Sequence, residues 1–305
     1  MQVGFLEFRE NRFIESVAQG LSDLETGSIR VGELAHPSPA PARVIIDRVS
    51  FCDPFLRTVV RYWSRAGAYV INSPFFTPTT DKLSELLLYD ELGILHPRTV
   101  LLPRINRAED MRELVAEPDW SAIERTIGFP CILKPVDGYA WQDVFRVETP
   151  TALRSIYDSL SDSRTLLVQE LVEFVDYYRA FCVDRKDVML VRWTPRPFDQ
   201  GEYAEADLGA LDGIQGPMMD QTARLVGAQG IDFNTVEWSI TRERRPVIID
   251  SYNDVPDVRP EKLPPRAYQW IVERFCACVR RKLSSGERNM ERAPAVPSDP
   301  RSGPG

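Results

Sequence analysis

The sequence has few of the side chains on which proton-transfer mechanisms usually depend. It contains only two histidines, His36 and His96, which lie far apart in the chain. The five cysteines are odd in number and scattered, and no histidine stands near them at the spacing of a zinc site. This scarcity argues against histidine-based acid–base catalysis and against a zinc site. It favours small buried thiols in a reducing compartment.

Long apolar runs and the familiar nucleotide-binding signatures are also missing. No stretch approaches the ~18 consecutive apolar residues of a membrane helix, and the first residues lack the apolar core of a signal peptide. There is no Gly-x-x-x-x-Gly-Lys-Ser/Thr loop, no Gly-x-Gly-x-x-Gly turn and no Gly-x-Ser-x-Gly elbow. The net charge of −8 argues against nonspecific nucleic-acid binding. We therefore expect a cytoplasmic protein with neither a membrane nor a nucleic acid as partner.

Short apolar runs alternate with helical patterns, which predicts an α/β fold. Near the N-terminus, runs at 44–46 and 69–71 flank a helix that begins at Asp53-Pro54, with Asp as N-cap and Pro as the first helical residue. Such a strand–helix–strand unit implies parallel strands. Further strands are expected at 99–102, 130–135, 144–147, 166–170, 179–183, 188–193, 233–240 and 246–250. Further helices are expected at about 80–93, 107–127, 150–160, 217–228 and 265–283, and the polar residues 284–305 are expected to be disordered.

A lysine ends one of these apolar strands. Lys134 closes the strand at 130–135 and precedes a loop at 136–142. An ammonium group held at a strand end beside loop amides suits an anionic phosphate. Taken alone, a solvated surface lysine is the simpler interpretation, because exposed lysines are common.

Two acidic residues belong to the last two strands. Glu237 lies within the strand at 233–240, Asp250 ends the apolar strand at 246–250, and Asn253 follows after a short turn. If the strands pair as a hairpin, the carboxylates come side by side. Oxygen ligands at close range suit Mg²⁺, and a cation would relieve their mutual repulsion. A pair of surface acids at strand edges is about as good an interpretation in isolation.

The strand at 166–170 runs into a polar connection, Leu171-Val172-Glu173. Such a connection can be a hinge between two lobes, with backbone groups that pair with an adenine edge and an acid that accepts from ribose hydroxyls. An ordinary strand exit explains the same pattern.

Taken together and in order, these features resemble the ATP-grasp superfamily over roughly residues 45–260. The segments that carry the resemblance are Thr80-Asp81-Lys82 before a helix ending at Gly93, Ile127 to Pro135, Val168-Gln169-Glu170, Tyr178-Arg179-Ala180-Phe181, and Glu237 with Asp250 and Asn253.

The resemblance implies a nucleotide site in which Lys82 and Lys134 hold the phosphates of ATP from two sides. The loop at Gly138 would close over these phosphates. The adenine hinge and the ribose acceptor would come from Glu170, Val172 and Glu173.

The resemblance also implies a metal site and two arginines beside it. One or two Mg²⁺ ions, or Mn²⁺ in their place, would be bound by Glu237, Asp250 and Asn253. Arg179 and Arg192 would face the cleft from adjacent strands and stabilise the transferred phosphoryl group or the acyl phosphate.

For the fold, the resemblance implies an N-terminal Rossmann-like subdomain followed by two α+β lobes that enclose the nucleotide. The corresponding ranges are 1–78, 79–164, 165–284 with the metal site, and a disordered tail at 285–305. The implied activity is ATP-dependent joining of a small-molecule or peptide carboxylate to an amine through an acyl phosphate. A homodimer is compatible with the resemblance.

Two departures from the superfamily pattern keep alternatives open. The loop after Lys134 reads Asp-Gly-Tyr-Ala-Trp-Gln-Asp and is not glycine-rich, and Asn253 stands three residues after Asp250. One alternative is a nucleotide-binding module that has lost ligation, and another is a small-molecule kinase. ADP release with candidate substrates, and the mass of the product, would distinguish the three.

Overall fold

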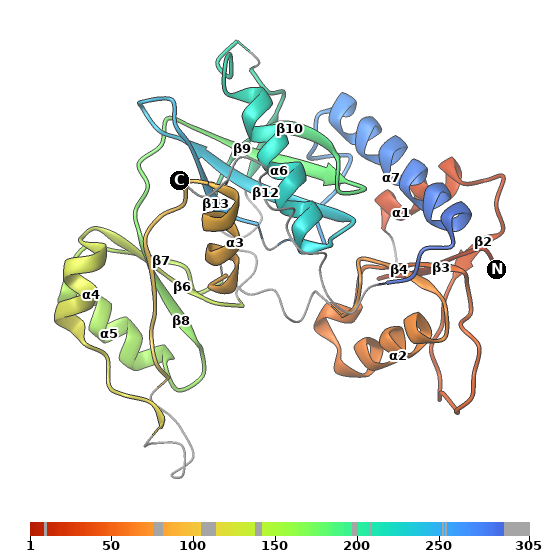
Figure 1. The fold of residues 1–305 in the computed structure, drawn as a ribbon, viewed down its shortest axis with the longest axis horizontal. Helices are drawn as coiled ribbons and strands as arrows, with labels where there is room; N and C mark the ends of the chain where they lie inside the picture. The colour runs from red at the N-terminus through yellow and green to blue at the C-terminus, as the bar shows by residue number, and fades with distance from the viewer. Residues whose placement is uncertain are drawn as a thin grey trace, which may run out of the picture.

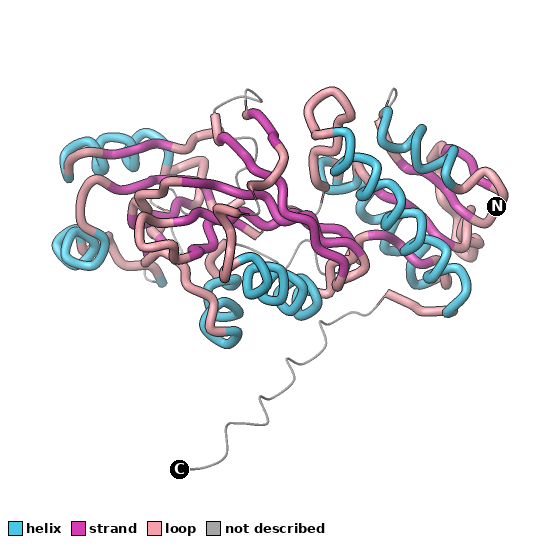
Figure 2. Tube along the Cα trace, turned by 90° about the horizontal axis from the view of Figure 1, so that it is seen from above, coloured by secondary structure: helices cyan, strands magenta, loops and turns pink. Residues whose placement is uncertain are grey.

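The chain is described by a computed structural model in which three sheets follow one another through the molecule (Figure 1). In Figure 1 the N-terminal sheet lies on the right, the largest sheet in the middle and the third sheet at the lower left. Figure 2 shows that helices flank these strands, some of them between the N-terminal sheet and the largest sheet. The mixture of strands and helices agrees with the predicted α/β class. The residues described are 1–8, 11–75, 82–104, 114–137, 142–196, 201–207, 209–251, 253 and 255–289.

The N-terminal sheet is wholly parallel, with strand order β2-β1-β3-β4. The predicted parallel pairing of the strands at 44–46 and 69–71 is therefore confirmed. Asp53 caps the helix between them by accepting a hydrogen bond from the Leu56 amide at 2.8 Å. The elements of this unit are β1 (Val3–Leu6), α1 (Arg12–Gly20), β2 (Thr26–Ser28), β3 (Val44–Asp47), a 3₁₀ turn (Ser50–Cys52), α2 (Pro54–Arg65) and β4 (Tyr69–Ile71).

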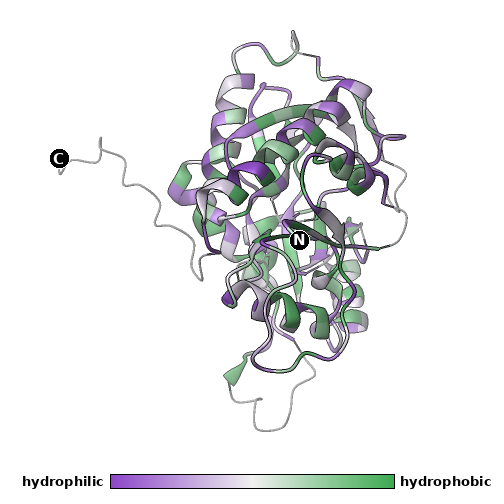
Figure 3. Cartoon of the chain, turned by 90° about the vertical axis from the view of Figure 1, so that its right-hand side faces the viewer, coloured by the Kyte–Doolittle hydropathy of each residue, from purple (hydrophilic) through white to green (hydrophobic). Residues whose placement is uncertain are grey.

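The helices of this unit are amphipathic. In α2 the buried side chains include Val59, Val60 and Trp63, which recur at helical spacing. Figure 3 shows the same mixture of hydrophilic and hydrophobic residues along the helices generally. Among the described residues, none of the helices combines the length and apolar character needed to span a bilayer.

The largest sheet is antiparallel, with strand order β11-β10-β9-β12-β13. Its strands are β9 (Asp176–Val183), β10 (Asp187–Thr194), β11 (Glu202–Ala204), β12 (Phe233–Ile240) and β13 (Pro246–Asp250). The strand pairing confirms the hairpin considered for β12 and β13 and shows that β9 and β10 form another, whereas β11 was not predicted. One face packs on α3 (Ser84–Leu92) and α6 (Gln215–Gln229), and the other packs on α1 and α7 (Pro265–Ser285).

The third sheet is antiparallel, with order β5-β8-β6-β7, and carries its helices on one face. Because side chains alternate along a strand, Leu133 points into the helix-covered core and Lys134 points to the opposite face. The elements of this lobe are β5 (Thr99–Leu101), α4 (Trp120–Ile127), β6 (Cys131–Pro135), β7 (Phe145–Val147), α5 (Pro150–Leu160) and β8 (Leu166–Glu170).

Two predicted helices differ in extent from the observed ones. The helix expected from about residue 80 begins at Ser84, and residues 76–81 lie outside the described residues. Of the segment at 107–127, α4 is the described helix, and it begins after Asp119, whose carboxylate accepts from the Ala122 amide at 2.9 Å. Residues 105–113 lie outside the described part.

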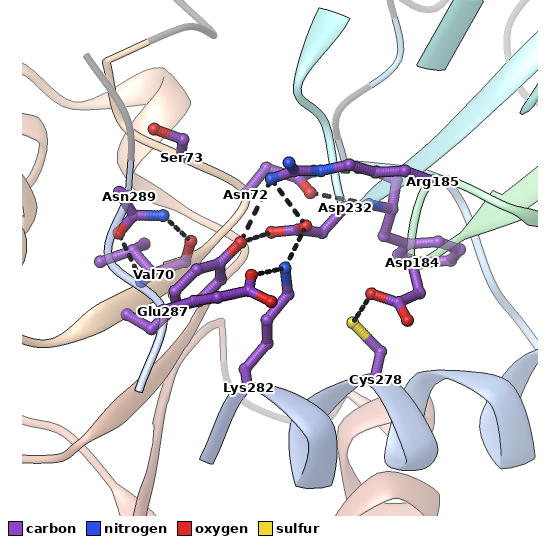
Figure 4. A network of polar contacts seen from close by, with 12 residues as sticks. Val70, Asn72, Ser73, Asp184, Arg185, Asp232, Cys278, Lys282, Glu287 and Asn289 are labelled. Atoms are coloured by element: carbon purple, nitrogen blue, oxygen red, sulfur yellow. Dashed lines mark hydrogen bonds and ion pairs between the residues drawn. The ribbon is translucent and has the colours of Figure 1, made fainter. Parts of the chain in front are cut away.

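A partly buried group of charged and polar side chains ties the N-terminal sheet, the largest sheet and α7 together (Figure 4). The Lys282 ammonium lies 3.0 Å from an Asp232 oxygen and 2.7 Å from a Glu287 oxygen. Asp232 also accepts from the Tyr69 hydroxyl at 2.7 Å and pairs with Arg185 at 3.0 Å. We call these five residues the joint.

The chain beyond α7 also packs against the N-terminal sheet. The Asn289 side-chain oxygen accepts from the Val70 amide at 2.7 Å, and its amide nitrogen donates to the Val70 carbonyl at 2.8 Å (Figure 4). The prediction of disorder from residue 284 is therefore wrong for 284–289, because charged and amide groups in this polar stretch find partners on β4 and in the joint. Residues 290–305 lie outside the described residues.

Candidate active site

Side chains from three separate elements meet where the third sheet faces β13. Lys82 precedes α3, and its ammonium lies 2.6 Å from a carboxylate oxygen of Asp250 at the end of β13. Lys134, from β6, lines the same pocket and is only 7% exposed. We call this pocket, whose walls also include Glu85, Tyr89 and Gln169, the interlobe pocket.

The two lysines influence each other in this pocket. The pKa of Lys134 is lowered to about 8, first by burial and then by the nearby charge of Lys82, although the carboxylates of Asp250 and Glu237 act in the opposite direction. The backbone of Lys134 is paired with β8, but its ammonium forms no ion pair or hydrogen bond with any residue that the structure describes. The pocket therefore holds a buried ammonium that contacts no countercharge among the described residues, an arrangement that suits an anion.

The two predicted carboxylates are direct neighbours across the sheet. Glu237 on β12 is the register partner of Asp250 on β13, with a β-bulge beside the pair. Asn253 lies farther along, because its backbone carbonyl accepts from the amide of Thr235, two residues before Glu237. The expected hairpin and the side-by-side placement of the acids are thus confirmed.

Glu237 is already engaged by neighbours. One of its oxygens accepts from two nitrogens of Arg179, at 3.0 and 2.6 Å, and the other accepts from the Tyr177 hydroxyl at 2.6 Å. Arg179 is the register partner of Glu237 on β9, so the two side chains share one face of the sheet.

The prediction that Arg192 faces the cleft beside Arg179 is wrong. Arg179 pairs in register with Val191, and Arg192 pairs with Tyr178, so the two arginines lie on opposite faces of the sheet. Arg192 instead forms an ion pair with Asp176 at 2.7 Å and is largely exposed. A shift of one residue along β10, from Val191 to Arg192, moves a side chain to the other face of the sheet. The sequence alone does not give the strand register, so it could not show on which face Arg192 lies.

The connection between β8 and β9 joins the third sheet to the largest sheet. Glu170, at the end of β8, accepts from Arg98 at 2.9 and 3.1 Å, so its carboxylate holds β5 to β8. Val172 is half-buried, and Glu173 is exposed. Backbone amides of residues 171–174 have no partner among the described residues, which leaves them available to a ligand. Gly138, the predicted phosphate-loop glycine, lies outside the described residues.

Oxygen donors dominate the predicted metal site. The carboxylates of Glu237 and Asp250 adjoin each other, and an amide side chain follows at Asn253, a donor set that fits Mg²⁺. In the described part of the chain, no three or more His, Cys, Asp or Glu residues cluster at metal-binding distance. A metal at these residues would therefore take its remaining ligands from water and substrate.

Comparisons with known proteins bear on this arrangement. No protein-family model matches the sequence, and no curated protein matches it. Solved structures do match. D-alanine–D-alanine ligase from Bacillus anthracis is similar with a TM-score of 0.66 and 13% identity, over 93% of this chain and 97% of that one.

Two peptide-bound structures match over a similar length. The ATP-grasp ligase PsnB, complexed with a minimal precursor, has a TM-score of 0.64 and 17% identity over 92% of this chain and 99% of that one. The macrocyclase MdnC from Microcystis aeruginosa MRC, bound with precursor peptide MdnA, has a TM-score of 0.64 and 13% identity over the same shares. This chain has the ATP-grasp fold. The interlobe pocket lies between the third sheet and β13 of the largest sheet.

Several residues around the interlobe pocket and Glu237 were not predicted from the sequence. Tyr177 stands two positions before Arg179 on the same strand, so the alternation of side chains could have placed it on the same face. Glu85 accepts from the Ser251 hydroxyl at 3.1 Å and so holds the backbone next to Asp250. Its partner lies 166 positions away, and no local pattern signals such a contact.

Proposed function

We propose that the protein is an ATP- and Mg²⁺-dependent ligase that joins a carboxylate to an amine through an acyl phosphate. The observation that carries this proposal is the meeting of Lys82, Lys134 and Asp250 in one pocket between the two lobes. A triphosphate with its metal ion supplies both the anion that the lysines lack and the cation that the carboxylates can bind.

In the proposed mechanism, the lysines bind and orient the phosphates. Lys134 can direct its ammonium at a phosphate, because no other described residue pairs with that group. Lys82 exchanges its contact with Asp250 for a phosphate oxygen, and a metal ion takes the place of the ammonium at that carboxylate. A bound Mg²⁺ at Asp250, Glu237 and Asn253 would neutralise charge on the phosphates.

Alignment and charge neutralisation are the needs of phosphoryl transfer to a carboxylate. The substrate carboxylate attacks the γ-phosphorus, ADP leaves, and the amine then displaces phosphate from the acyl phosphate. None of these steps requires a histidine base or a covalent intermediate on the protein. We also propose that residues 170–172 contact the adenine at the hinge and that Glu173 accepts from the ribose hydroxyls.

The substrate side is proposed to lie at the N-terminal sheet. A second hollow opens at the carboxyl ends of β3 and β4 and includes Val255, two residues beyond Asn253, in its wall. Ligands of parallel sheets characteristically bind at this edge. Since PsnB and MdnC were each solved with a precursor peptide, peptide carboxylates are the first class to test, followed by amino acids.

The test is ADP formation from ATP and Mg²⁺ with pools of carboxylates and amines, with products identified by mass. Condensed products are expected, and Lys134→Ala is expected to abolish both ADP formation and Mg²⁺-dependent ATP binding. Lys186→Ala, at an exposed lysine in the β9–β10 turn, is the matched control. ATP binding without turnover in every pool would contradict ligation and favour a binding module, and a product that retains phosphate would favour a kinase.

A further inference from the structure

The Arg179–Glu237 pair is held from both ends by tyrosine hydroxyls. Tyr177, buried on β9, donates to the Oε2 atom of Glu237 at 2.6 Å. At the other end, the Nη1 atom of Arg179 donates to the Tyr203 hydroxyl at 2.6 Å. The four side chains form a continuous line of hydrogen bonds across β9, β11 and β12.

The guanidinium group is also fixed by aromatic rings. Its central carbon lies 4.1 Å from the centre of the Trp193 ring, and Trp193 packs against Tyr203 with ring centres 4.4 Å apart. Gly201 allows this approach, because a Cβ atom there would lie 1.9 Å from the Trp193 ring. The short strand β11 thus brings Tyr203 onto Arg179 and leaves the guanidinium little freedom to turn.

The hydrogen bonds determine where a cation can reach Glu237. A carboxylate has about four lone-pair positions, two on each oxygen. Oε1 accepts two N–H groups from Arg179, and Oε2 accepts one O–H group from Tyr177. Counting the partners within the described residues, a single position remains, and it is on Oε2. Glu237 can therefore bind a metal ion through that one oxygen, in the direction that Tyr177 leaves open.

We propose that Tyr177 and Tyr203 are positioning residues, which fix the Arg179–Glu237 pair and so aim the remaining lone pair of Glu237 at a metal ion beside Asp250. This inference rests on the proposed function, because it takes the metal to accompany a nucleotide. Burial raises the pKa of Tyr177 well above its usual range and that of Tyr203 to about 12, so Tyr177 remains a hydrogen-bond donor and Tyr203 an uncharged acceptor at neutral pH. Groups that orient a metal ligand in this way affect metal affinity without touching the metal.

The experiment is calorimetric titration of ADP at a series of Mg²⁺ concentrations, and also without Mg²⁺. Wild type, Tyr177→Phe, Tyr203→Phe and Tyr178→Phe are compared, with thermal unfolding as a check on folding. Mg²⁺ is expected to strengthen ADP binding, and half of this strengthening is reached at a certain Mg²⁺ concentration. We expect Tyr177→Phe to raise that concentration by about tenfold or more. We expect a smaller rise for Tyr203→Phe, whose hydroxyl acts through Arg179, and no change in Mg²⁺-free ADP binding in either variant.

Tyr178→Phe is the matched control, because Tyr178 is the next residue on β9, is equally buried, and donates to Asp176 on the opposite face. It should leave both titrations unchanged. Wild-type Mg²⁺ dependence in Tyr177→Phe and Tyr203→Phe, or an equal loss in Tyr178→Phe, would overturn the inference while leaving the proposed function intact. A wild-type protein that binds ADP without any effect of Mg²⁺ would overturn both. If Tyr177→Phe unfolds, Tyr203→Phe decides the question alone.

Discussion

Two buried lysines of this chain have opposite surroundings. Lys282 in the joint touches two carboxylates, at 3.0 and 2.7 Å, and lies over the Tyr69 ring, with 4.4 Å from its ammonium to the ring centre. Lys134 in the interlobe pocket has no ion-pair partner within the described residues and has a second ammonium nearby. Removing a buried charge that has its partners leaves those partners uncompensated, whereas a buried charge without partners marks a place for a ligand.

The largest expected effect on stability comes from removing the ammonium of Lys282, the lysine that has its partners. Lys282→Met leaves the buried carboxylate of Asp232 without its ammonium partner, which should lower the free energy of unfolding by about 3–5 kcal/mol. Urea denaturation at neutral pH measures this. A loss below about 1 kcal/mol would contradict the view that the joint holds the N-terminal sheet to the rest of the molecule.

The converse change, Lys134→Met, should preserve or increase stability and abolish Mg²⁺-dependent ATP binding. The pKa of Lys134 is about 8 when folded and 10.5 in its reference state, so the folded protein releases this proton more readily than the unfolded chain does. Stability should therefore rise with pH between about 8 and 10.5 in wild type relative to Lys134→Met. The difference between their unfolding free energies across that pH range measures the effect, and a flat difference would contradict the burial of an unpaired ammonium.

Two asparagines sharpen the comparison at a smaller scale. Asn289→Ala removes two hydrogen bonds to the Val70 backbone and should destabilise the protein by about 1–3 kcal/mol without affecting nucleotide binding. Asn253→Ala should weaken Mg²⁺-dependent ADP binding with little effect on stability. Thermal unfolding and calorimetry are measured on both variants. Weaker ADP binding in Asn289→Ala, or a loss of stability in Asn253→Ala, would contradict these expectations.

The smallest effect is expected at Arg192. Its ion pair with Asp176 is partly exposed to solvent, so Arg192→Ala should cost no more than about 1 kcal/mol. Nucleotide binding should be unchanged, because the side chain lies on the face of the sheet away from Glu237. Loss of ATP binding in this variant would restore the cleft-facing role that the strand register excludes.

Much of the fold could be predicted because its signals are local. The pair Asp53-Pro54 predicts the start of α2, and the apolar run at 246–250 predicts β13 with Asp250 at its end. Lys134 and the two carboxylates could likewise be singled out, since a charge at the end of an apolar strand is costly without a purpose. Their order along the chain then indicated the fold.

What could not be predicted depends on register and on distant contacts. Arg192 was placed on the wrong face because the strand pairing, and not the spacing of arginines, decides where each side chain points. The tyrosine contacts of Glu237 and Arg179 come from β9 and from β11, a strand of three residues with no clear sequence signal. Asn289 was assigned to a disordered tail because its partner is Val70, 219 positions earlier.

The contact between Asn289 and Val70 also bears on self-association. β4 is an edge strand of its parallel sheet. The backbone amide and carbonyl of Val70 point away from β3, toward the open edge. An unpaired edge strand of this kind can pair with a strand from another molecule. The Asn289 side chain presents the same donor and acceptor as a peptide group and occupies that position itself. We expect this contact to keep Val70 from pairing with a strand of another molecule.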